Sequence, residues 1–349
     1  LLHEFVPATA KTVAIEGTSA SSFEVTGPVS QPDAQPPFRG LKTGAPIKWS
    51  AGEVYGVKLG AAELKPALAD GKLTLPPAKI PTGGGGAVNL TGTVDFAPAD
   101  PLLSVPEPLQ ALDRVPLTPD VAGLLSWVNP IFKGVVQIEG RVNLRTREVA
   151  LPLGETLKQA AQGQGVLDLR DVRLAPGGFL GELTHLMGVL PGQALIPVEF
   201  NQVELVIRDG RVHYDNFAMM FPNNLDLKFY GSVGFDSTLD LVVSLPVGMP
   251  LVERLGLKAP GLQQLQPLSG LRIDIPIAGT REQPKLDFSK VDKEKLLKEV
   301  LKQVTPGGKL LEQLPVKPKL PELPELLPGL GKKEPPKPPP PPPERPERK

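Results

Sequence analysis

Histidine and cysteine are the side chains best suited to proton transfer, nucleophilic attack and metal binding near neutral pH. The chain has three histidines, His3, His185 and His213, which lie far from one another in the sequence, and we expect none of them to bind a metal or act as a general base. Cysteine is absent, which excludes disulfides, thiolate catalysis and cysteine-based zinc sites. The sequence also has no nucleophile elbow, phosphate loop or dinucleotide fingerprint. We therefore expect no metal, no cofactor and no catalytic residues, and predict that the chain is not an enzyme.

Two weaker patterns favour a structural explanation over a functional site. Residues 83–86 are consecutive glycines without a following Lys-Ser/Thr, which predicts a loop between strands and not a phosphate site. Asp168 and Asp171 alternate with apolar residues, which predicts solvated positions. A hydrolase is the lowest-ranked alternative, because it needs a cleft with converging carboxylates of raised pKa. Trp49 and Trp127 are isolated in the sequence, so sugar-stacking aromatics are scarce.

Composition favours strands and turns. Of 349 residues, 40% are hydrophobic but only 5% aromatic, so a core must be built mainly from Leu, Val and Ile. The 43 prolines and 36 glycines disfavour long helices. Lys plus Arg and Asp plus Glu are equal at 38 each, which argues against nucleic acid as a partner because no excess of basic residues exists to neutralise phosphates.

The segment from 196 to 245 has the clearest pattern. Apolar and polar residues alternate there, and Asp209-Gly210 predicts a type I′ hairpin turn. Strands with this alternation predict a sheet with one apolar face and one solvent-exposed face. The candidate lipid-binding residues on the apolar face are Val203, Leu205, Ile207, Leu225, Leu227, Phe229, Val233, Phe235, Leu239, Leu241, Val243, Ile273, Ile275 and Ile277.

The expected fold is mainly β, an elongated antiparallel sheet that forms an open groove, with a closed β-sandwich as the alternative. Short helices are expected at 155–162 and 179–190. In the strand at 165–174, strict alternation places Val166 and Val172 on one face and Leu167 and Leu169 on the other.

An internal repeat relates two parts of the chain. Asp209-Gly210 follows Asp70-Gly71 by 139 residues (209 − 70), and the same ungapped offset matches both Gly-x-Val-x-Phe pieces, at 92–96 and 231–235. We interpret these as two copies of one β-unit that share an apolar face. The predicted organisation is N-terminal strands and loops at 1–50, a first unit at 51–145, a second at 146–288, an amphipathic helix at 289–304 and a tail at 305–349.

The C-terminal segments suggest contacts with a membrane or a partner. Ser289 is the expected N-cap of the helix, whose lysine-rich face suits either anionic lipid or ordinary solvent exposure. The tail contains the proline run 338–343, which predicts a disordered polyproline spacer or a ligand for a proline-reading partner. The chain starts at Leu1 without an initiator methionine, so we expect it to continue from an upstream region.

The sequence resembles the AsmA family and its TamB-type relatives. Three features carry the resemblance: the Asp-Gly hairpin in VELVIRDGRVHY, the Gly-x-Val-x-Phe-Asp return into LDLVV, and the ending Pro-Ile-x-Gly-Thr-x-x-x-Pro-Lys-Leu-Asp at 276–287. The match covers residues 165–288 well and 51–145 weakly. The long proline-rich tail departs from the family pattern.

The resemblance implies a membrane-anchored protein of the bacterial cell envelope. Its expected location is the periplasm, with an N-terminal helix upstream of this chain in the inner membrane. Its expected function is to bind or conduct phospholipid along an apolar β-groove, in lipid transport between the membranes or outer membrane biogenesis. The alternative is a non-catalytic structural or interaction β-domain of the envelope, whose proline-rich tail binds a partner.

Overall fold

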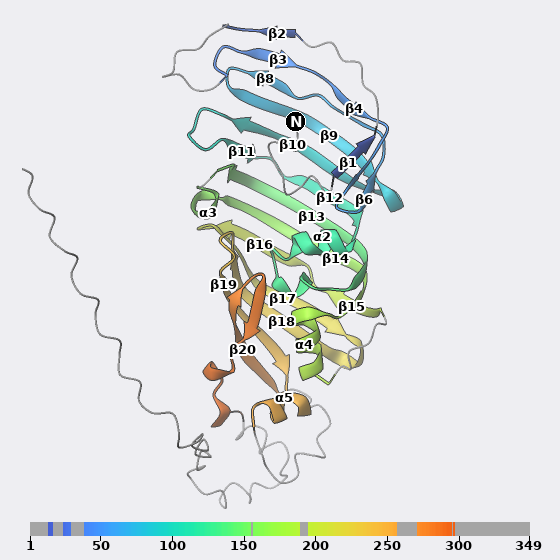
Figure 1. The fold of residues 1–349 in the computed structure, drawn as a ribbon, viewed down its shortest axis with the longest axis vertical. Coiled ribbons are helices and arrows are strands. Elements are labelled where there is room, and N and C mark those ends of the chain that lie inside the picture. The colour runs from blue at the N-terminus through green and yellow to red at the C-terminus, as the bar shows by residue number, and fades with distance from the viewer. Residues whose placement is uncertain are drawn as a thin grey trace, which may run out of the picture. The chain divides into compact units, whose positions relative to one another are not determined.

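The computed structural model describes residues 13–16, 24–28, 38–154, 156–188, 195–256, 271–294 and 296, all within one compact unit, residues 1–306 (Figure 1). The prediction of a mainly β fold with one large antiparallel sheet is confirmed. The expected tail at 305–349, and most of the expected helix at 289–304, lie outside the described residues.

The main sheet grows strand by strand along the chain, because nearly every strand pairs antiparallel with the one before it. Its first part contains β2 (Glu24–Thr26), β3 (Lys42–Gly44), β8 (Ala67–Ala69), β9 (Lys72–Thr82), β10 (Gly86–Asp95), β11 (Leu102–Val105), β12 (Leu109–Pro116) and β13 (Gln137–Pro152). It continues through β14 (Gln162–Ala175), β15 (Ile196–Phe200), β16 (Val203–Arg208), β17 (Arg211–Phe221), β18 (Leu225–Gly234), β19 (Leu239–Pro246), β20 (Arg272–Thr280) and β21 (Gln283–Leu286).

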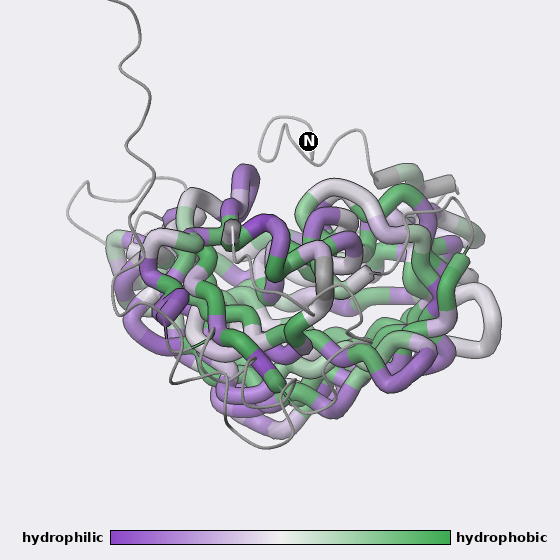
Figure 2. Tube along the Cα trace, turned by 90° about the horizontal axis from the view of Figure 1, so that it is seen from below, coloured by the Kyte–Doolittle hydropathy of each residue, from purple (hydrophilic) through white to green (hydrophobic). Residues whose placement is uncertain are grey.

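Smaller strands fold back near the start of the sheet. β1 (Val13–Glu16), β5 (Ala51–Val54) and β6 (Val57–Leu59) pair in sequence, and β6 joins β9 through Leu59 and Thr82. β4 (Ile47–Trp49) and β7 (Ala62–Leu64) form a separate pair. Hydrophobic and hydrophilic residues are interspersed along the backbone (Figure 2). In β16, buried or partly buried residues alternate with exposed ones, as expected for a sheet with different faces.

Short helices lie in the connections between strands: α2 (Pro119–Leu125), the 3-10 turn η2 (Pro130–Phe132), α3 (Leu157–Ala160), α4 (Gly178–Leu186) and α5 (Met249–Arg254). α2 begins where the sequence provides a cap, since the Thr118 hydroxyl accepts a hydrogen bond from Val121 N at 3.2 Å and Pro119 occupies the first turn. α3 and α4 fall where short helices are expected. In Figure 1, α2 and α4 lie in front of the later strands of the sheet.

The two segments related by the 139-residue offset have the same succession of elements. β9 and β10 are joined by the 3-10 turn η1 (Gly83–Gly85), and β17 and β18 are joined by η3 (Pro222–Asn224), with every boundary displaced by the same offset. Both Asp-Gly turns have positive φ at each residue, as type I′ turns require. The Phe96 amide donates to Gly71 O, and the Phe235 amide donates to Gly210 O, both at 2.9 Å. We call β8–β10 the first repeat and β16–β18 the second repeat.

A bulge at matching glycines also recurs in the two repeats. The pairing of β9 with β10 shifts between Leu90 and Gly92, and that of β17 with β18 shifts between Tyr214 and Phe217, opposite Gly231. Gly92 has a φ of 148° and Gly231 a φ of 120°, a region that L side chains rarely adopt. A bulge bends the strand, so these glycines contribute to the curvature of both repeats.

Two predictions about local structure are wrong. β14 has a bulge opposite Gly140, with Asp171 at a φ of 52°, so Val172 turns to the same face as Leu167 and Leu169. Strict alternation misses this, because one extra residue in a strand reverses the facing of all that follow. Ser289 is not a helix N-cap: it lies inside the 3-10 turn η5 (Phe288–Lys290), where Asp287 Oδ1 accepts its amide hydrogen at 3.1 Å.

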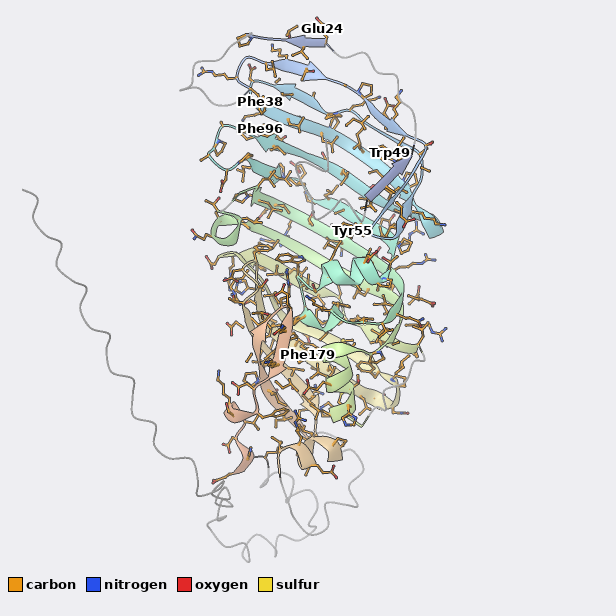
Figure 3. All side chains as sticks on the ribbon, viewed as in Figure 1. Glu24, Phe38, Trp49, Tyr55, Phe96 and Phe179 are labelled. Carbon is orange, nitrogen blue, oxygen red and sulfur yellow. The ribbon has the colours of Figure 1, made fainter. Side chains whose placement is uncertain are left out.

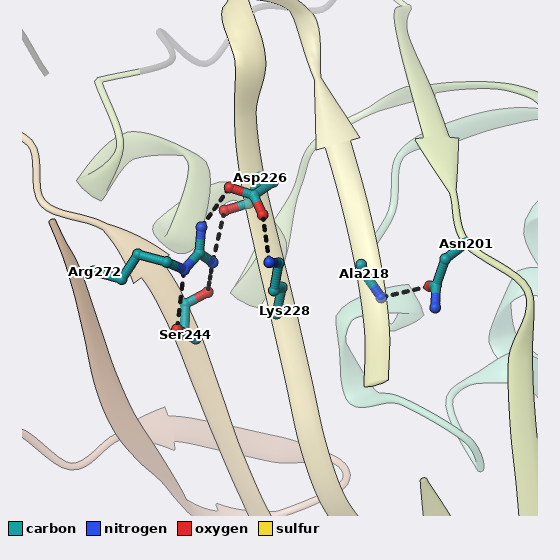
Figure 4. A network of polar contacts seen from close by, with 6 residues as sticks. All are labelled: Asn201, Ala218, Asp226, Lys228, Ser244 and Arg272. Atoms are coloured by element: carbon teal, nitrogen blue, oxygen red, sulfur yellow. Dashed lines mark hydrogen bonds and ion pairs between the residues drawn. The ribbon is translucent and has the colours of Figure 1, made fainter. Parts of the chain in front are cut away.

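An asparagine joins β15 and β16 into one interrupted strand. Asn201 lies between them, and its Oδ1 accepts the Ala218 amide hydrogen at 2.7 Å (Figure 4). Its Nδ2 donates to Asn216 O at 3.0 Å. The side-chain amide thus replaces backbone groups opposite β17 and leaves the sheet continuous where its strand breaks.

Candidate functional site

The candidate residues predicted from alternation lie on one face of the sheet, which we call the inner face. Strand pairing places Phe229 opposite Phe217 and Val243, and Val243 in turn opposite Ile275. The same register aligns the remaining candidates of β16, β18, β19 and β20. Binding of lipid to these residues stays a prediction.

The chain itself covers most of this part of the inner face. Phe229, Val233, Val243 and Ile275 are 0% exposed, and they share a hydrophobic core with residues of α2, η2, α4 and α5. Ile207, Leu225, Phe235 and Leu239 are partly buried at its border. From α4, the core receives Phe179 (labelled in Figure 3), Leu180, Leu183 and Leu186. Because helices fill this face, its aliphatic side chains contact protein.

The first repeat presents the same face in a more exposed form. Leu73 and Leu75 of β9, and Leu90 and Val94 of β10, are partly exposed, whereas Thr74 and Lys79 on the other face are exposed. The offset equates Leu90 with Phe229 and Val94 with Val233, which are both 0% exposed. No described α-helix lies in front of β8, β9 and β10 in Figure 1. The inner face of the first repeat is therefore apolar and only partly covered.

The partly exposed surface continues onto neighbouring strands. Val94 faces Leu103 of β11, and Val88 faces Leu112 of β12, which in turn faces Leu144 of β13. A hollow of about 350 Å³ is lined by residues of β9, β10 and β12. Its lining includes Ala78, Leu90 and Leu109, together with polar side chains.

An aromatic pair lies beside this surface, at one end of its strands. The rings of Phe38 and Phe96 meet edge to face with centroids 5.1 Å apart, and Figure 3 shows the two residues next to each other at one end of the strands. Phe38 remains 42% exposed. A large exposed ring beside partly exposed leucines extends the apolar surface to the ends of the strands.

A contact that the sequence did not predict links the segment after α2 to the end of β18 and to the β20–β21 turn. The guanidinium carbon of Arg281, in the β20–β21 turn, lies 3.2 Å from the ring centroid of Trp127, which follows α2. The ring of Phe235, at the end of β18, lies 6.1 Å from the Trp127 ring. Trp127 is therefore not isolated: it joins α2 to two strands distant in the sequence, and no local pattern identifies such a pair.

A polar network occupies the other face of the same strands (Figure 4). Arg272 forms an ion pair with Asp226 across β19, and its Nη2 donates to Ser244 O at 2.8 Å. Lys228 Nζ lies 3.6 Å from Asp226 Oδ2. These groups link β18, β19 and β20 on the outer face, a structural role that the alternating pattern allows.

A few titratable groups of the described residues have a pKa displaced from its usual value. Hydrogen bonds, from Ala97 to Asp95 and from Thr238 to Asp236, lower the pKa of these carboxyl groups. Burial raises the pKa of Tyr214 well above its usual value, and its hydroxyl lacks a hydrogen-bond partner. His185 is exposed on α4, and His213 pairs with Val206 in the β16–β17 hairpin. His3 lies outside the described residues. Among the described residues, no cluster of His, Cys, Asp or Glu side chains could hold a metal ion.

None of the helices in the described part of the chain is long and apolar enough to cross a membrane. Comparison of the chain with known proteins found no matching family model, no similar curated protein and no similar solved structure. The resemblance to the AsmA family therefore stays a prediction that rests on the sequence motifs.

Proposed function

We propose that this protein binds phospholipid in the cell envelope, with acyl chains held on the inner face of the first repeat. The proposal rests on a difference in solvent exposure between equivalent positions of the two repeats. Leu90 and Val94 are partly exposed, whereas Phe229 and Val233 are fully buried. Apolar area left in water costs roughly 25 cal/mol per Å², so an apolar ligand that covers this face gains free energy. Acyl chains suit it, because the surface is aliphatic and offers few directional polar groups.

The expected setting is the periplasm, with an anchor in the inner membrane upstream of this chain. The family resemblance supports this setting and a contribution to lipid transport between membranes. The apolar face supports the ligand class alone, because none of its described features selects a head group.

The proposal is tested by purifying the full chain and analysing its bound lipid by native mass spectrometry and thin-layer chromatography of extracts. Phospholipid should copurify with the wild type. Leu75→Glu, on the inner face of β9, should lower the amount bound, because it places a charge among the acyl chains. Thr74→Glu is the matched control, since Thr74 precedes Leu75 and is exposed on the other face. Lipid-free wild-type protein, or equal loss in both variants, contradicts the proposal.

The second candidate function is a structural or interaction β-domain whose proline-rich tail binds an envelope partner. The closed core of the second repeat favours this structural function, because the second repeat needs no ligand to cover its apolar side chains. Deleting residues 307–349, a separate unit from 1–306, should leave the thermal unfolding midpoint and bound lipid unchanged but weaken partner binding. A lower unfolding midpoint after deletion would show that the tail packs on the sheet.

A further inference from the structure

The row of short helices on the inner face ends next to the partly exposed surface. η2 contacts α4, α4 contacts α5, and α2 contacts β13. Val121 and Ala122 of α2 are buried, as are Ile131 and Phe132 of η2. The helical layer therefore begins at β13 and covers the sheet from there onward.

Contacts at both ends hold α2 and η2 in place. At the start of α2, Thr118 Oγ1 donates to Tyr55 O, in the β5–β6 turn, at 2.8 Å. After its end, Trp127 stacks on Arg281. Asn129 is 0% exposed and caps η2, since its Oδ1 accepts the Ile131 amide hydrogen at 3.1 Å. Contacts with two distant turns, β5–β6 and β20–β21, and the cap by Asn129 thus hold this element against the sheet.

The surface that the described residues leave partly covered is short. From β3 to β13 the sheet takes five steps, through β8, β9, β10 and β12, and neighbouring strands lie about 4.8 Å apart, so the surface is about 24 Å long. The hydrocarbon core of a bilayer is about 30 Å thick and contains two layers of chains, so each acyl chain occupies about 15 Å. The surface has room for one chain along its length, but not for two end to end.

The geometry points to α2 and η2 as the wall that ends the acyl-binding surface. The first repeat then holds an acyl chain of limited length and does not pass it on along the second repeat. This inference rests on the proposed function, and it makes the inner face a bounded site with a preference for chain length.

The residues beside the wall are the ones that set this length. Val88, Leu112 and Leu144 are partly buried and pack against the core that contains α2 and η2. Leu90 and Leu103 do not belong to that core in the described residues. The far end of a bound chain is therefore expected near Leu144, and a larger side chain there shortens the surface.

The test measures the affinity of the full chain for lysophosphatidylcholines of increasing chain length, each below its micelle concentration. Burial of each added CH₂ group should tighten binding roughly fourfold until the chain reaches the wall, after which affinity should stop rising. A rise that continues to the longest chain overturns the inference and leaves the proposed function standing. Absence of binding at every length overturns both.

A variant pair tests the position of the wall. Leu144→Trp should move the plateau to a shorter chain without changing the gain per CH₂ group, because the new ring fills the surface beside α2. Arg145→Trp is the matched control, since Arg145 is the next residue of β13 and is exposed on the outer face. An unchanged plateau in Leu144→Trp, with binding and the unfolding midpoint retained, places the end of the site elsewhere and overturns the inference.

Discussion

The first and second repeats have the same strands, turns and bulges but different coverings. The inner face of the second repeat is covered by α4, which lies in the connection between β14 and β15. The offset equates its residues 178–186 with residues 39–47, which form a turn, β3 and the start of β4. Gly40, Gly44 and Pro46 in that segment disfavour a helix. The comparison shows that the connections, and not the strands, decide whether this sheet is closed or left accessible.

The largest effect is expected from truncating equivalent positions of the two repeats. Phe229→Ala should destabilise the chain by about 3–5 kcal/mol, because Phe229 is 0% exposed and its ring lies 6.2 Å from that of Phe217. Leu90→Ala should cost only about 1 kcal/mol, since Leu90 is partly exposed. Urea unfolding of both variants measures the difference. Equal losses would show that the first repeat is as tightly packed as the second.

The bulge glycines provide the next comparison. Gly231→Ala should cost about 3 kcal/mol, because φ is 120° and the new Cβ would meet Asp240 O. Gly92→Ala should cost about 1–2 kcal/mol, because its Cβ would lie 2.9 Å from Ser104 O at the edge of the short strand β11. The free energies of unfolding from urea titrations check both values. A neutral Gly231→Ala would indicate that β18 and β19 can separate without loss.

Loss of the contact between Arg281 and Trp127 should have a smaller effect on stability. Arg281→Ala removes the guanidinium that stacks on Trp127 and should cost about 1 kcal/mol. In a Trp49→Phe background, Trp127 is the sole tryptophan, so its emission reports the contact directly. Arg170→Ala is the control, since Arg170 is exposed and forms a surface ion pair with Asp168. The idea fails if Trp127 emission is the same with and without Arg281.

Much of the strand arrangement could be predicted from sequence, because alternation and Asp-Gly turns are local signals. The repeat followed from the same signals, since glycine and aspartate at fixed spacing specify turns and bulges. The bulge at Asp171 could not be predicted, because a non-glycine residue with positive φ leaves no pattern in one sequence. Fourteen candidate positions were assigned to the inner face from alternation alone, and the covering of that face depends on tertiary contacts.

A signal for this covering was nevertheless present in the sequence. Thr118 followed by Pro119 is a helix start, and Phe179, Leu183 and Leu186 form an apolar stripe that must be buried somewhere. Taken together, they indicate helices that pack on a nearby apolar face. The pairing of Trp127 with Arg281 is different, because side chains so far apart in sequence meet only once the sheet has formed.

The smallest predicted effect concerns acid stability at the turn after the second repeat. The Thr238 hydroxyl and amide both donate to Asp236 Oδ1, and they lower the pKa of this carboxyl group below its usual value. A carboxyl with a lowered folded-state pKa stabilises the fold above its unfolded-state pKa, and this contribution is lost as pH falls through the folded-state pKa.

Asp236→Asn should therefore cost no more than a few tenths of a kcal/mol at neutral pH, because the group is exposed and solvent screens it. The difference from the wild type should vanish in acid, below the folded-state pKa, where the wild-type carboxyl is protonated as well. Urea midpoints of both proteins, measured from neutral pH down to about pH 2, check this course. In the first repeat, Ala97 occupies the position equivalent to Asp236, so Ala97→Asn is the matched control and should leave the pH profile unchanged. A difference between Asp236→Asn and the wild type that stays constant with pH would mean that the aspartate acts through turn geometry and not through its charge.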